Sequence, residues 1–141
     1  MDRSLLPHAA ELFRNAAKVH LQPRADFYER YNPLTGEPLS SFRDYMHSWW
    51  IDLFIRHVAG LMIQEDGSVV IDPLSLGLEH FELRGAPFRG KKIDVLWSGS
   101  EKSAAEGSAN PGLTVRMNGK EILRRADFKP GDALIKIDLK K

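Results

Sequence analysis

The stretch Glu65–Ile71, with the sequence EDGSVVI, marks the point at which the hydrophobic pattern of the chain changes. Before this stretch, apolar residues recur with the 3.6-residue period of an α-helix; after it, they alternate with the period of two that is typical of a β-strand. Its first three residues are a turn signal. We therefore expect an α+β fold, in which two N-terminal helices at residues 1–66 precede an antiparallel, sandwich-like β-rich domain at residues 67–141.

The first helix is predicted over Leu6–His20, with Ser4 as a candidate cap and Pro7 in the first turn, where proline is tolerated. Its apolar residues share one face at helical spacing: Leu5, Ala9, Leu12, Phe13, Ala16 and Val19. His8 and His20 lie off a common face, and we interpret both as surface residues.

The second helix is predicted over Asp44–Gln64 and is apolar on nearly all sides. The residues that give it this character are Met46, Trp49, Trp50, Leu53, Phe54, Val58 and Leu61. Because such a helix is normally buried on several sides, one other helix and a small sheet do not suffice to cover it.

Short strands separated by glycine and proline turns are predicted for the β-rich domain. Glu79–Leu83 and Ile93–Trp97 flank residues 84–90, a turn region with room for one short strand. Asn118-Gly119 is the strongest hairpin signal, for a type I′ turn. The last strand is predicted over Ala133–Leu139. Residues 98–112, rich in Ser, Gly and Ala, are expected to form a flexible loop.

Composition excludes several classes of protein. The chain of 141 residues has a formal net charge of +1, which gives no basis for binding nucleic acid or an anionic membrane. It has no Cys, and its five His are not at metal-site spacing, so we expect no metal and no cofactor. No apolar run is long enough to span a membrane. The N-terminus lacks a signal-peptide pattern, so a cytoplasmic location is expected if Met1 is the true start.

The least ordinary stretch is Phe27–Pro38, within a loop expected over residues 26–38. Three aromatic residues surround Glu29 and Arg30, and turn signals follow at once. A carboxylate beside aromatic rings is typical of sites that act on sugars. The alternative is an exposed Glu29–Arg30 ion pair of little energetic value beside a core tyrosine.

The segment YERYNPLTG, Tyr28–Gly36, resembles the late active-site motif of glycoside hydrolase family 63 and of mannosylglycerate-hydrolase-like enzymes, and is similar to a shorter motif of trehalases. Two further stretches resemble the same enzymes in the same order. One is Ser48–Leu61, and the other is Ile71–Leu74, followed by Gly77–Phe81 and Arg89–Val95. Together these stretches cover about residues 25 to 97.

The resemblance implies that the helices are the end of an (α/α)₆ barrel, an α/α-toroid, and that the β-rich region is its C-terminal extension. It implies an inverting glycosidase in which Glu29 is the general base. The substrate-binding residues it implies are Tyr28, Tyr31, Asn32, His47 and Trp49, although His47 stands where the family usually has Trp. The family's general acid lies upstream, and no carboxylate of this chain matches it.

The sequence thus predicts the C-terminal portion of an inverting hydrolase of O-glycosidic bonds that carries the general base without the general acid. The implied partners are a carbohydrate substrate and either the remainder of the barrel or a second copy, which would cover the apolar helix. The alternative is a stand-alone carbohydrate-binding or oligomerisation module without catalysis.

Overall fold

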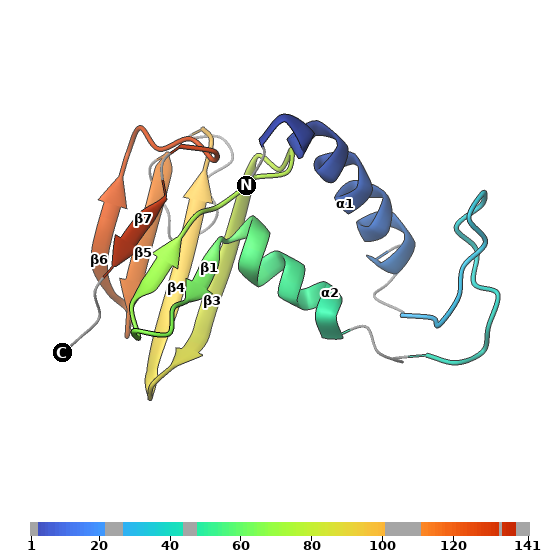
Figure 1. Cartoon of the computed structure of the whole chain (residues 1–141), viewed down its shortest axis with the longest axis horizontal. Helices are drawn as coiled ribbons and strands as arrows, with labels where there is room; N and C mark the ends of the chain where they lie inside the picture. The colour runs from blue at the N-terminus through green and yellow to red at the C-terminus, as the bar shows by residue number, and fades with distance from the viewer. Residues whose placement is uncertain (1–2, 22–26, 44–47, 101–110, 133, 138–141) are drawn as a thin grey trace. The chain divides into compact units, whose positions relative to one another are not determined.

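The computed structural model describes residues 3–21, 27–43, 48–100, 111–132 and 134–137. The chain divides into two compact units, Met1–Asp52 and Leu53–Lys141. Helices dominate the first unit and strands the second, which confirms a mixed α+β fold (Figure 1). None of the helices among the described residues is long and apolar enough to cross a bilayer.

Helix α1 (Leu6–Leu21) follows the short 3₁₀-helix η1 (Arg3–Leu5) and agrees with the predicted first helix. Its expected apolar face is wrong in part, because Leu5 and Leu12 are 60% and 70% exposed. Phe13 is buried as expected, and Ala10, which was not expected on this face, is buried as well. Lys18 and His20 occupy the last turn, where positive charge is favoured by the helix dipole.

Residues 28–43, here called the arm, fold back on themselves. Isolated bridges pair Tyr28 with Arg43 and Tyr31 with Pro38. The backbone N–H of Leu39 donates to the carbonyl of Arg30 at 2.9 Å. The stretch predicted to be an extended loop is therefore held by its own backbone hydrogen bonds.

The second predicted helix is shorter than expected. Helix α2 (Ser48–Leu53) runs into a π-helical turn, η2 (Phe54–Val58), and strand β1 (Leu61–Ile63) follows. Gly60 lies between η2 and β1, and its φ angle of +66° is incompatible with a right-handed helix. The prediction of a helix to Gln64 was wrong because the apolar pattern continues past Gly60 and carries no information about its backbone conformation.

Two antiparallel sheets form the second unit (Figure 1). The first has the order β1-β2-β7, with β2 at Val69–Ile71 and β7 at Ile135–Ile137. The second has the order β3-β4-β5-β6, and its strands are His80–Phe88, Lys91–Ser98, Gly112–Met117 and Lys120–Arg125.

Two hairpins join the strands of the larger sheet. The predicted Asn118-Gly119 turn is confirmed, with φ angles of +51° and +78°. The turn region expected at residues 84–90 is mostly strand, because β3 continues to Phe88 and only Arg89-Gly90 turns. A bulge between Leu83 and Ala86 absorbs the irregular segment, and the Asp94 carboxylate accepts the Gly85 N–H at 2.7 Å.

The core of the second unit is built from β-branched and leucine side chains. Those at most 1% exposed are Val69, Ile71, Ile93, Val95, Leu96, Leu113 and Val115. The two sheets meet at their turns: the Arg89 guanidinium lies 2.5–2.7 Å from where a Cβ on Gly67 would be. Residues 101–110 of the predicted flexible loop lie outside the described residues.

Candidate functional site

The tip of the arm is built around Asn32. Its side-chain oxygen accepts the N–H groups of Leu34 at 2.9 Å and Thr35 at 3.2 Å, and its own N–H donates to the Glu37 carbonyl. This arrangement is an Asx turn, which asparagine favours. The amide oxygen of Asn32 is therefore committed to the turn, although the sequence suggested that Asn32 binds substrate.

Glu29 lies on an exposed bend of the arm. Its N–H donates to the Phe42 carbonyl at 3.1 Å, which fixes the backbone. Its Oε2 atom is 3.7 Å from Arg30 Nε and 3.5 Å from the Ser40 hydroxyl, both long contacts. The side chain is 36% exposed, so nearby rings do not desolvate it. Glu29 therefore presents a carboxylate to solvent from a fixed piece of backbone, with only weak side-chain restraints.

An aromatic cluster forms where α1, the arm and α2 meet within the first unit. His20 is at its centre, with ring centroids 5.2 Å from Phe27, 5.1 Å from Tyr31 and 5.4 Å from Trp50. Phe13 stacks on Trp50 at 6.2 Å. The interpretation of His20 as a surface residue was wrong: it is half-buried, on the same helix face as Phe13, two turns away.

Tyr31 connects the arm to α1. Its hydroxyl accepts the Tyr28 N–H at 2.7 Å and lies 3.1 Å from Nδ1 of His20. Tyr28 packs edge-on against Tyr31, and the Arg43 guanidinium lies 5.2 Å from the centre of the Tyr28 ring. Both tyrosines were predicted to bind substrate. In the structure, their contacts hold the bend at Glu29 in place.

The two remaining predicted site residues are not seen. His47 and the side chain of Trp49 lie outside the described residues. The neighbouring Trp50 is 3% exposed and belongs to the aromatic cluster. Four of the six residues predicted for the site therefore lie on the arm: Tyr28, Glu29, Tyr31 and Asn32.

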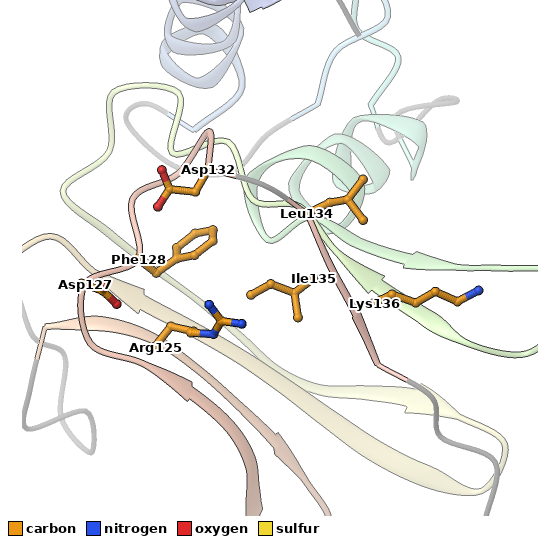
Figure 2. A pocket seen from close by; sticks show the side chains of 7 residues that line it. All are labelled: Arg125, Asp127, Phe128, Asp132, Leu134, Ile135 and Lys136. Carbon is orange, nitrogen blue, oxygen red and sulfur yellow. The ribbon is translucent and has the colours of Figure 1, made fainter.

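A second candidate site is a pocket of about 350 Å³ in the second unit. Figure 2 shows its lining residues, which come from the end of β6, the loop that follows, and β7: Arg125, Asp127, Phe128, Asp132, Leu134, Ile135 and Lys136. Sequence reasoning missed this pocket, because only the pairing of β7 with β2 brings its walls together. The charged residues around the Pro130-Gly131 turn were its only local signal.

Among the described residues, no group of three or more His, Asp or Glu side chains is arranged to hold a metal ion. The described elements define an α+β protein with a helical first unit and two antiparallel sheets in the second. Comparison of the chain with protein-family models, curated proteins and solved structures found no match.

Proposed function

We propose that this chain is the C-terminal portion of an inverting glycoside hydrolase resembling family 63, in which Glu29 is the general base. The observation that carries the proposal is the support of Glu29. Its carboxylate faces solvent from an arm in which the Tyr31 hydroxyl accepts the Tyr28 N–H and forms a hydrogen bond with His20 on α1. A base held on fixed backbone can address a water molecule without reorganisation during the reaction.

In the proposed reaction, the Glu29 carboxylate takes a proton from water as the water oxygen attacks the anomeric carbon. The bond to the leaving oxygen breaks, and a general acid protonates that oxygen. Inverting enzymes separate the two carboxyl groups by about 6.5–9.5 Å to leave room for the water. Glu37, the other described carboxylate of the arm, accepts a hydrogen bond from Thr35 and does not match the position of the family's general acid, so in this proposal the acid comes from outside the arm.

Exposed apolar side chains of the first unit support the remainder of the proposal. Six large apolar residues there are 47–94% exposed: Leu5, Leu12, Leu34, Leu39, Phe42 and Ile51. Such surface is typical of a contact face. In this proposal α1 and α2 are the last helices of an α/α-toroid, the missing barrel covers these residues, and the two sheets are its sandwich-like extension.

The decisive experiment starts with the natural gene product. Mass spectrometry of the source cell, using peptides of this chain, is expected to find a much larger polypeptide. That polypeptide should hydrolyse α-glycosides, and Glu29→Gln should lower kcat by about 10²–10⁴-fold, because general base catalysis contributes that much. Glu37→Gln is the matched control, since Glu37 lies on the same arm and bonds Thr35.

Two results would contradict the proposal. A natural product of 141 residues without hydrolase activity would overturn it and favour the alternative, a carbohydrate-binding or oligomerisation module. Hydrolysis by the 141-residue chain alone, abolished by Glu29→Gln, would show that the general acid lies within this chain. The pocket of the second unit is the observation that keeps the binding module as the second candidate.

A further inference from the structure

The pocket of the second unit combines an apolar wall with charged groups of both signs. Ile135 and the 56% exposed Leu134 form the wall, and the Phe128 ring closes one side. Figure 2 shows the Arg125 guanidinium facing the same space as the Phe128 and Ile135 side chains. A volume of about 350 Å³ falls within the range of roughly 300–1,000 Å³ that is usual for small-molecule sites.

The backbone around the pocket is fixed by hydrogen bonds. The Asp132 carboxylate accepts the Lys129 N–H at 2.8 Å, which closes the turn between β6 and β7. The Phe128 carbonyl accepts the indole N–H of buried Trp97 at 3.3 Å, which fastens the loop to β4. These bonds hold the backbone of the pocket in place, so little ordering cost is added when a ligand binds.

Two charged groups of the pocket have no side-chain partner among the described residues. Lys136 pairs with Asp66 at 2.9 Å, and Asp132 bonds its own turn. Within the described part of the chain, neither the Arg125 guanidinium nor the Asp127 carboxylate has a side-chain hydrogen bond or ion pair. They are thus available to a ligand, one as a donor and the other as an acceptor.

We propose that this pocket binds a single neutral sugar residue. A hydroxyl group can both donate and accept, so neighbouring hydroxyls of a sugar satisfy a guanidinium, which only donates, and a carboxylate, which only accepts. The apolar face of the sugar ring packs against Ile135 and Leu134. Two cations and two carboxylates line the pocket, and this balance gives an anionic ligand no electrostatic advantage.

This inference is independent of the proposed hydrolase, because no residue of the arm contributes to the pocket. Loss of the Glu29 carboxylate should leave sugar binding unchanged. Conversely, binding at the pocket would stand even if the chain proved to have no part in hydrolysis.

The test is a titration of the ¹⁵N-labelled 141-residue chain with glucose, mannose, galactose and their methyl glycosides, followed by NMR. At least one sugar is expected to shift amide signals of residues 125–136, with a dissociation constant on the order of millimolar. Arg125→Gln and Asp127→Asn should each weaken this binding by about tenfold or more, because each removes a hydrogen bond to a charged group.

Arg124→Gln is the matched control. It makes the same charge change one residue earlier on β6, where the side chain contacts Thr114 at 3.4 Å instead of the pocket, and binding should be unchanged. Far-UV circular dichroism confirms the fold of each variant. The proposal is overturned if no sugar shifts these signals, if Arg125→Gln binds as well as the unmodified chain, or if acetate or inorganic phosphate binds the pocket more tightly than every sugar.

Discussion

At the scale of single residues, Tyr31 determines how the candidate base is presented. Its hydroxyl joins the backbone before Glu29 to His20 on α1, at 2.7 and 3.1 Å. His20 in turn packs against Phe27 and Trp50. One phenol therefore couples the arm to the aromatic cluster, and Glu29 itself makes only long side-chain contacts.

Replacing Tyr31 with Phe should loosen the arm. The Tyr28 N–H and the His20 ring nitrogen both lose this partner while they are half-buried, so we expect the first unit to lose about 1–2 kcal/mol of stability. Hydrogen exchange at the Tyr28 amide should accelerate by roughly tenfold. Tyr28→Phe is the control, since its hydroxyl has no hydrogen bond within the described residues. Unchanged exchange in Tyr31→Phe would contradict this role.

At the scale of elements, Gly60 ends the helical segment and allows β1 to begin. Its carbonyl accepts the Asp72 N–H at 2.9 Å, and a Cβ at this position would lie 2.2 Å from the Asp72 carbonyl carbon. Backbone meets backbone here, so no side-chain movement relieves the overlap.

Gly60→Ala should therefore destabilise the second unit by more than about 4 kcal/mol, because steric overlap adds to the cost of positive φ. Gly85→Ala is the matched control: its φ is +69°, but nothing lies within 4 Å of the added carbon. It should lose only about 1–2 kcal/mol. Equilibrium urea unfolding measures both, and equal losses would show that the close approach to Asp72 is unimportant.

The turn between β1 and β2 carries a pH-dependent contact with β7. The Asp66 carboxylate accepts the hydroxyl and N–H of Ser68 at 2.6 and 2.8 Å, and pairs with Lys136 at 2.9 Å. The Ser68 hydroxyl, followed by Lys136, holds the pKa of Asp66 well below its ordinary value of 3.8. The folded state therefore favours the ionised carboxylate.

The contribution of Asp66 should be fully present at neutral pH and should fade as the pH falls below about 4, because the unfolded chain then takes up the proton first. Asp66→Asn should lower the stability of the second unit at neutral pH and have a smaller effect at about pH 3. Unfolding curves at both pH values test this. Asp127→Asn, a carboxylate without such partners among the described residues, is the control. A pH-independent effect of Asp66→Asn would contradict the ionisation argument.

At the scale of the whole molecule, exposed apolar side chains are unequally distributed. Of the eight large apolar residues that are exposed in the described part of the chain, Leu34 at 94%, Leu12 at 70% and Phe42 at 68% are the most exposed. All three belong to the first unit. Surface of this kind favours association when no partner covers it.

The isolated chain is therefore expected to self-associate as its concentration rises. Sedimentation velocity should show species larger than the 16.0 kDa monomer, and the double variant Leu12→Gln with Phe42→Ser should reduce them. Ile63→Thr, which removes an exposed apolar residue of the second unit but keeps a β-branched side chain, should leave association unchanged. A monomer at every concentration would contradict the expectation.

Local patterns predicted much of this structure. The change of period near Glu65–Ile71 correctly predicted helices followed by strands, although the second helical segment already ends at Val58 and β1 lies before this stretch. Leu6–His20 was placed almost to the residue, because its apolar period repeats over many positions. The Asn118-Gly119 turn was predictable because Asn followed by Gly is the pair that most readily adopts the two positive φ angles of a type I′ turn. Turn residues also predicted a loop around Glu29 over residues 26–38, although the arm reaches Arg43 and pairs with itself.

The sequence by itself determined the α+β class, the first helix, the hairpin and the arm, since each depends on residues close together in the chain. Tertiary structure decided the burial of His20, the end of the second helix at Gly60 and the pocket beside Arg125. Each of these requires distant segments: α1 against the arm, Gly60 against Asp72, and β7 paired with β2. The apolar pattern shows which residues can be buried, but only the packing of the folded chain determines which residues they contact.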